Sequence, residues 1–393
     1  MRVGPEDDPV AWLIDTSHLL PPHELGPVVA RALAACGATD VALHLIDHDE
    51  RRLNRLWPPA AGSASIEVDG TVAGAAYAAG RTRAEALEGA ARQWVPLLDG
   101  TARLGVVAVD LPAPSPHPAL VAQVERVVAL AAELLVAKEQ YTDDFEVARR
   151  CRPMTLAAEL QRSNLPPDAL VTPAVAVAGI LQPAYAVAGD SFDYALGAAG
   201  LDVAVLDSVG HDLASALVSH LVQGSLRNSR RRGLDLVESY EVADATLASM
   251  YPDHRFATAA FGHLDPATGS FRWVSAGHPA PLVVRGNEVT GEASTVATMP
   301  IGLRHTGVPA VNQVDLAPGD SLVLYTDGVT EGGARGGERF GLERFVDVLE
   351  RVLDEAVPPA EVLRRLGHAV LAHSAYELHD DTTIVLVQRR RQP

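Results

Sequence analysis

The strongest constraint on this sequence is a repeated pattern in which a short apolar run meets an aspartate. The pattern occurs at three places: residues 203–206 before Asp207, residues 321–325 shortly before Asp327, and Asp380 with Asp381 before residues 382–388. Apolar runs of this length predict buried strands. Because an acid at the end of a buried strand points into the space that the sheet leaves open, the repetition predicts several carboxylates at one sheet edge.

A fourth acid, Asp190, stands in a similar setting after residues 186–189. A single aspartate of this kind is equally well explained by a turn or a helix cap, because aspartate is common in both. Four such acids without a cluster of cysteine or histidine indicate a site built from oxygen ligands. That ligand set suits Mg²⁺ or Mn²⁺ better than Zn²⁺.

Length and charge narrow the class of protein further. The 393 residues predict two domains, and the formal net charge of −18 argues against nucleic acid or an anionic membrane as the main partner. The two cysteines, Cys36 and Cys151, are too few for a disulfide framework, which fits a reducing cytoplasm. No signal peptide or transmembrane segment is recognisable. We therefore expect a cytoplasmic protein that acts on a protein or a small molecule.

Six short motifs follow one another in the C-terminal part of the chain. They are LQRSNLP at 160–166, AGDSFD at 188–193, DSVGH at 207–211, SAGHPAP at 275–281, YTDGVTE at 325–331 and DDTT at 380–383. In this order they resemble the SpoIIE/RsbU-type PP2C-like serine/threonine phosphatases of bacteria. The resemblance implies an α+β fold for residues 166–393, an αββα sandwich of two antiparallel sheets flanked by helices.

The same resemblance implies a site for two divalent ions, Mn²⁺ or Mg²⁺. Asp207 would bridge both ions, and the main-chain carbonyl of Ser208 would complete one of them. Asp327 and Asp380 would bind the second ion, with Asp381 as the alternative if the last motif is aligned one residue later. Two such ions activate water and stabilise the attacking and leaving oxygens of an in-line displacement.

The resemblance also bears on neighbouring residues in these motifs. Asp190 would act through metal-bound water, and His211 is either the general acid for the serine leaving group or a structural residue. Asp212, where the family usually has glycine, either caps the helix expected from residue 213 or adds a carboxylate for a further ion. His278 and Asp193 are expected to support the site without binding metal.

The N-terminal residues 1–117 show a different pattern. A helix is expected over residues 22–36, followed by strands at 40–47 and 53–57 and by two strands that meet at Asp99 and Gly100. This order resembles a GAF domain, which would bind a small ligand or serve as an empty dimerisation module.

Residues 118–165 are expected to form a helical linker. An apolar stripe runs from Leu120 to Phe145, and Pro153 interrupts the helix. The stripe packs either on its own domain or against a second copy in a coiled coil, so a homodimer is possible.

Together these features predict a metal-dependent protein-serine/threonine phosphatase with a GAF-like regulatory domain. The resemblance implies a phosphorylated STAS-type anti-sigma factor antagonist as its substrate, and no nucleic-acid or membrane partner is expected. One alternative is a non-catalytic signalling scaffold in which the GAF-like domain senses a ligand. Another is a hydrolase of small phosphate esters, which would keep the metals but change the partner.

Overall fold

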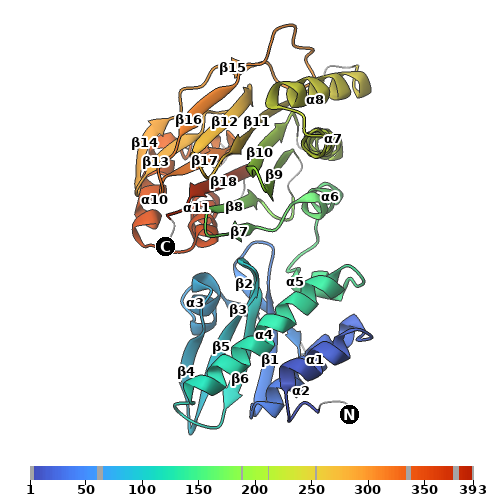
Figure 1. Ribbon diagram of the computed structural model, residues 1–393, viewed down its shortest axis with the longest axis vertical. Coiled ribbons are helices and arrows are strands. Elements are labelled where there is room, and N and C mark those ends of the chain that lie inside the picture. Colours follow the sequence, from blue (N-terminus) through green and yellow to red (C-terminus); the bar gives the residue numbers. More distant parts are fainter. Residues whose placement is uncertain are drawn as a thin grey trace. The chain divides into compact units, whose positions relative to one another are not determined.

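A computed structural model describes residues 4–59, 65–186, 189–210, 212–252, 255–332, 338–374 and 380–391. The chain divides into two compact units, Met1–Pro153 and Met154–Pro393 (Figure 1). Among the described residues, no helix combines the length and the apolar character needed to cross a membrane.

The N-terminal unit is a six-stranded antiparallel sheet with strand order β3-β2-β1-β6-β5-β4 and helices on both faces. Its strands are β1 Asp40–Ile46, β2 Arg52–Trp57, β3 Ser65–Glu67, β4 Arg83–Leu87, β5 Ala90–Asp99 and β6 Ala102–Leu111. Its helices are α1 Pro9–Ser17, η1 Pro22–Glu24, α2 Leu25–Ala35, α3 Val72–Ala79, α4 Pro118–Glu139 and α5 Asp144–Arg149. Side chains alternate along β1, so Leu43 packs in the core with α1, α2 and α4, whereas Ala42 packs in the core with α3.

Several elements of this unit differ from the sequence prediction. The sequence analysis did not predict α1, α3 or β4. The helix α3 (VAGAAYAA) is made mostly of alanine and shows no apolar period. The strand β4 is largely exposed, so it lacks the apolar pattern of a buried strand. The long helix ends at Glu139 instead of continuing to residue 150. Tyr141 is 78% exposed, and the hydroxyl of Thr142 accepts a hydrogen bond from the Asp144 amide where α5 begins.

The apolar stripe of α4 is buried within the N-terminal unit itself. Val124, Val127, Val128, Ala131 and Leu135 are at most 1% exposed and belong to the same core as the sheet. This packing accounts for the stripe without a second chain. The first compact unit ends at Pro153, and the expected domain boundaries at residues 117 and 165 stay predictions. The GAF-like character of the unit and a separate linker remain predictions.

The C-terminal unit contains two stacked sheets. One has the order β15-β12-β11-β10-β9, with β16 also paired to β12, and the other has the order β14-β13-β17-β18-β8-β7. All pairs are antiparallel except β12 with β15. The first sheet contains β9 Asp190–Gly197, β10 Gly200–Ser208, β11 Ala257–Leu264, β12 Ser270–Ala276, β15 Ala297–Thr298 and β16 Asn312–Asp315. The second contains β7 Ala169–Val171, β8 Val175–Gln182, β13 Leu282–Arg285, β14 Glu288–Glu292, β17 Ser321–Tyr325 and β18 Thr382–Arg389.

Helices cover the outer face of each sheet. The helices α7 Leu213–Arg231 and α8 Leu236–Met250 pack on the first sheet, and α10 Leu342–Asp354 and α11 Pro359–His373 pack on the second (Figure 1). A separate core lies between the sheets. The helix α6 Leu156–Asn164 packs beside α7, and the short α9 Gly328–Glu331 follows β17. This arrangement confirms the predicted αββα sandwich.

Candidate active site

Strand alternation determines which acids face the space between the sheets. Leu201, Val203 and Val205 of β10 belong to the core between the sheets, so the next residue of that series, Asp207, points to the same side. Asp207 pairs in register with Asp190 on β9. On its other side Asp207 pairs with Thr258 on β11. The first sheet therefore presents a row of three polar side chains at one end of the sandwich.

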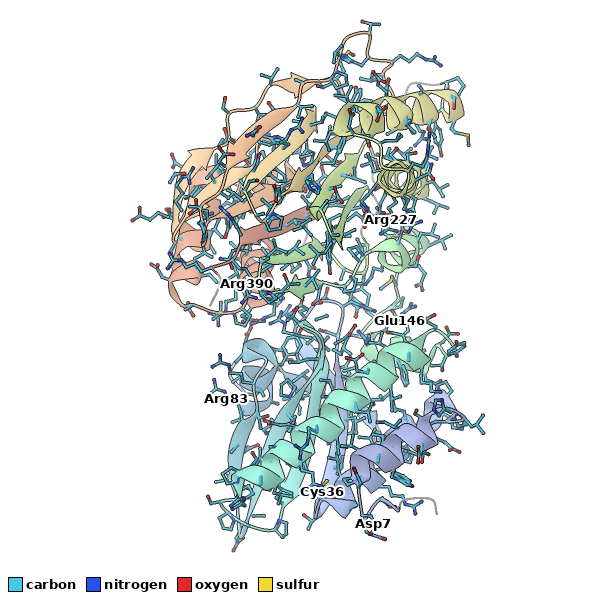
Figure 2. All side chains as sticks on the ribbon, in the orientation of Figure 1. Asp7, Cys36, Arg83, Glu146, Arg227 and Arg390 are labelled. Atoms are coloured by element: carbon cyan, nitrogen blue, oxygen red, sulfur yellow. The ribbon has the colours of Figure 1, made fainter. Side chains whose placement is uncertain are left out.

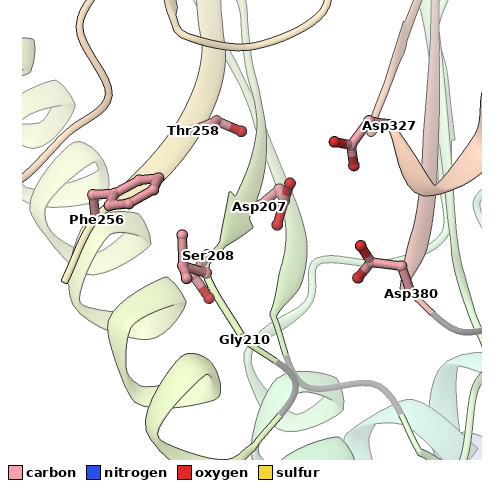
Figure 3. Close-up of a pocket in the computed structure, with 8 residues that line it drawn as sticks. Asp207, Ser208, Gly210, Phe256, Thr258, Asp327 and Asp380 are labelled. Carbon is pink, nitrogen blue, oxygen red and sulfur yellow. The ribbon is translucent and has the colours of Figure 1, made fainter. Parts of the chain in front are cut away.

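The second sheet brings two further acids to this row. Asp327 follows β17 and Asp380 precedes β18, and both line a cavity of about 400 Å³ together with Asp207. Figure 3 shows the carboxylates of Asp327 and Asp380 facing that of Asp207 across the cavity. The remaining lining residues are Ser208, Val209, Gly210, Phe256 and Thr258. The predicted acids thus converge from the two sheets on one cavity.

Asp190 is not among the residues that line this cavity, and it is held by the opposite sheet. Its side chain is 1% exposed, and its Oδ2 accepts hydrogen bonds from the hydroxyls of Thr326 at 2.6 Å and Thr383 at 2.8 Å. The amide of Gln161 on α6 donates to the main-chain oxygen of Asp190 at 2.5 Å. These three partners were not predicted from the sequence, although Gln161, Thr326 and Thr383 stand inside three of the motifs.

Asp381 is directed differently from its neighbour Asp380. The Oδ2 atom of Asp381 accepts hydrogen bonds from the amides of Gly189 at 2.7 Å and Asp190 at 3.3 Å. The main chain of Asp381 also lies close to Gly328. A Cβ added to Gly328 would lie 1.8 Å from the main-chain oxygen of Asp381, so this position requires glycine. Asp380 lines the cavity, whereas Asp381 ties the segment before β9 to the mouth of β18. This geometry favours Asp380 over Asp381 as the direct metal ligand.

The clustered carboxylates strongly perturb one another. Burial, together with the charges of Asp327, Asp380 and Asp381, raises the pKa of Asp207 to about 7. Burial and the neighbouring Asp207 and Asp381 raise the pKa of Asp190 well above its usual range. Burial and Asp380 also raise the pKa of Asp327. None of the described residues that line the cavity carries a positive charge, so the site has an excess of negative charge facing one space.

This donor set fits divalent cations such as Mg²⁺ and Mn²⁺, which prefer carboxylate and carbonyl oxygens. Within the described residues, no three histidine, cysteine, aspartate or glutamate side chains are arranged to hold an ion by themselves. Mg²⁺ usually keeps several water ligands besides one or two carboxylates.

Comparison with known proteins agrees with this geometry. Residues 197–390 match the family of stage II sporulation protein E (SpoIIE). Over these 194 of its 393 residues the chain is similar to that family. The phosphoserine phosphatase RsbU of Bacillus subtilis (strain 168) is 21% identical over 237 residues, which cover 60% of this chain and 69% of RsbU. The phosphoserine phosphatase RsbP of the same organism is 24% identical over 185 residues, covering 46% of this chain and 45% of RsbP.

One solved structure is similar in both sequence and fold to the C-terminal unit. It contains the RsbU and RsbW domains of Rv1364c from Mycobacterium tuberculosis, with 29% identity and a TM-score of 0.50. The match covers 57% of this chain and 62% of that one. This chain thus spans less than two thirds of the mycobacterial chain and less than half of RsbP.

Other motif residues of the C-terminal unit have structural partners. Asp193 is 3% exposed and forms ion pairs with Arg227 and Arg230 of α7 (Arg227 is labelled in Figure 2). His278 is buried and contacts the hydroxyl of Thr258. The predicted general acid, His211, lies outside the described residues.

Asp212 is the N-cap of α7 in the C-terminal unit. Its Oδ1 accepts hydrogen bonds from the amide of Ser215 at 3.0 Å and from the Ser215 hydroxyl at 3.1 Å. Asp212 is not among the residues that line the described cavity. This geometry favours the cap over an additional metal ligand.

Replacing Asp212 with alanine is expected to lower the melting temperature by roughly 2–4 °C, because the first turn of α7 loses its cap. Turnover at a temperature well below the transition should stay near the wild-type rate. Differential scanning calorimetry and a phosphatase assay on the same preparation measure both effects. Loss of turnover at an unchanged melting temperature would instead support a role for Asp212 in metal binding.

The raised pKa of Asp207 predicts how stability depends on pH in metal-free protein. The unfolded carboxyl ionises near pH 4 and the folded one near pH 7, so the folded state binds more protons between these values. The free energy of unfolding should therefore fall as pH rises from about 4 to about 7, by at most ~1.4 kcal/mol per pH unit from this group, and level off above that. Denaturant titrations in chelator measure the slope. The Asp207→Asn variant is the control and should show a shallower slope.

Proposed function

We propose that the protein is a metal-dependent protein-serine/threonine phosphatase whose active site is the cavity between Asp207, Asp327 and Asp380. The observation that carries this proposal is the convergence of these three carboxylates, from both sheets, on one cavity of about 400 Å³. The names of the curated relatives RsbU and RsbP, both phosphoserine phosphatases, support the same reaction.

Each residue has a proposed task in this reaction. Asp207 would be shared by two divalent ions, with the main-chain oxygen of Ser208 on one and Asp327 and Asp380 on the other. When bound, such ions lower the pKa of a water molecule and polarise a phosphoryl oxygen. Asp190, which Thr326 and Thr383 hold in place, would orient water beside the ions. The acidic cavity would thus bind metal first and the phosphate dianion only through it.

A direct assay separates the phosphatase from a non-catalytic scaffold. Release of phosphate from a phosphoserine peptide should require Mn²⁺ or Mg²⁺ and stop when a chelator is added. The Asp207→Asn variant, assayed at the same metal concentration, controls for contaminating phosphatases. A comparison with para-nitrophenyl phosphate tests whether small esters are preferred. No metal-dependent release from either substrate would overturn the proposal.

We further infer that the physiological substrate is a phosphorylated STAS-type anti-sigma factor antagonist. The relative RsbU and the mycobacterial RsbU domain, which occurs in one chain with an RsbW domain, support this inference. A folded phosphorylated STAS domain should then be dephosphorylated with a higher kcat/KM than the isolated phosphopeptide from the same protein. Equal values for the two substrates would contradict it.

A further inference from the structure

Thr258 lines the cavity beside Asp207. It pairs in register with Asp207 on the neighbouring strand β11, and alternate residues of that strand, Ala260 and Leu264, belong to the core between the sheets. Its side chain therefore lies on the same face of the sheet as the Asp207 carboxylate. Figure 3 shows the Thr258 hydroxyl directed toward the side of the cavity where Asp327 lies.

A buried histidine lies behind this hydroxyl. The Nδ1 atom of His278 is 2.9 Å from the Thr258 Oγ1, and the histidine side chain is not in the cavity lining. The residue is 6% exposed, and its main-chain oxygen accepts a hydrogen bond from the Ser275 hydroxyl at 2.9 Å. The turn after β12 thus holds the imidazole directly behind the Thr258 hydroxyl.

The surroundings of His278 indicate its protonation state and its tautomer. Burial lowers the pKa of His278 to about 3, although the main chain of Tyr325 acts in the opposite direction. The ring is therefore neutral at physiological pH and carries one N–H. Among the described residues, Nε2 has no hydrogen-bond partner of standard geometry, but the Tyr325 main chain favours the charged ring, as a nearby acceptor does. We assign the N–H to Nε2 on this ground. Nδ1 is then an acceptor, and the Thr258 hydroxyl donates to it.

This assignment leaves the Thr258 oxygen with its lone pairs available toward the cavity. We propose that Thr258 is a catalytic residue that accepts a hydrogen bond from the water attacking the phosphorus, and that His278 is a positioning residue that holds the Thr258 hydroxyl in the accepting orientation. The proposal rests on the proposed phosphatase function. The neutral imidazole neither gives nor takes a proton during the reaction; it fixes a hydroxyl rotor that would otherwise turn toward the phosphate or the carboxylates.

The variants Thr258→Val and Thr258→Ser separate the hydroxyl from the shape of the side chain. Valine keeps the branched shape but loses the oxygen, so kcat toward a phosphoserine peptide should fall about tenfold, the worth of one hydrogen bond. KM and the affinity for Mn²⁺, measured by calorimetry without substrate, should stay within about twofold, because Thr258 is not assigned to either. Serine should restore most of kcat. Equal loss in both variants, or wild-type kcat in valine, would overturn the proposal.

The role of His278 is tested through its dependence on Thr258. His278→Ala should lower kcat by a similar factor, and adding it to Thr258→Val should cause little further loss, since both remove one interaction. Full additivity of the two losses would overturn the coupling. If His278→Ala does not fold, the proposed role of His278 can still be tested by measuring its tautomer in the wild-type protein. Nitrogen-15 NMR of labelled wild-type protein should show a protonated Nε2 and an unprotonated Nδ1 for His278, and the reverse pattern would overturn the assignment.

Failure of this inference is distinguishable from failure of the proposed function. Wild-type protein without metal-dependent turnover overturns both. Wild-type turnover with unchanged kcat in Thr258→Val overturns only the role of Thr258.

Discussion

Asp207→Asn is expected to lower kcat/KM for a phosphoserine peptide by on the order of 10³-fold or more, because the carboxylate proposed to be shared by both ions loses its charge and each ion contributes several kcal/mol to the transition state. Calorimetric titration should show weaker Mn²⁺ binding. In the absence of metal the variant should be at least as stable as the wild type above pH 7, since one of several mutually repelling carboxylates has become neutral.

The combination of lost activity and retained stability is what marks Asp207 as a functional residue. Asp315→Asn is a matched control, because Asp315 is an exposed aspartate at the end of β16 in the same sheet. It should leave both properties unchanged. A metal-free Asp207→Asn variant that unfolds more easily than the wild type would assign Asp207 to the fold instead of the metal site.

The second large effect concerns the adjacent acids at the mouth of β18. Asp380→Asn should weaken Mn²⁺ binding and reduce kcat/KM on the order of 10²-fold or more, with little change in metal-free stability, because Asp380 is an exposed residue that lines the cavity. Asp381→Asn should instead destabilise metal-free protein by about 1.5–3 kcal/mol, since the carboxylate accepts two main-chain hydrogen bonds while 7% exposed.

Denaturant unfolding in chelator and Mn²⁺ calorimetry on both variants measure this contrast. If Asp381→Asn weakens metal binding more than Asp380→Asn and leaves stability intact, the motif must be aligned one residue later and Asp381 is the ligand.

The sequence predicts those parts of the site that depend on the alternation of side chains along a strand. The apolar residues of β10 indicate that Asp207 points inward, because side chains repeat with a period of two. The choice between Asp380 and Asp381 is harder, since neighbouring residues point to opposite sides and a shift of one residue exchanges them. The contacts from Thr326 and Thr383 to Asp190 depend on how two sheets stack, and no local pattern encodes that.

The N-terminal unit shows a different limit. The turn at Asp99 and Gly100 was predictable, since Gly100 adopts a positive φ of 57° between β5 and β6. The helix α3 was not, because its alanines pack under a sheet face without any periodic contrast in polarity. The stripe on α4 was recognised, but a stripe alone does not tell whether its partner is the same unit or another chain.

The place of β18 in its sheet has a consequence for biosynthesis. This strand lies between β17 and β8 in the second sheet. It is also the last of the described strands in the sequence, so the ribosome makes it after β17 and β8. Asp380, Asp381 and Thr383 arrive with it, so a nascent chain still lacking this strand has only Asp327 of the two carboxylates that face Asp207, and Asp190 lacks part of its support. Cleavage before residue 380 would therefore remove the proposed metal ligand Asp380 and an inner strand of the second sheet in one event.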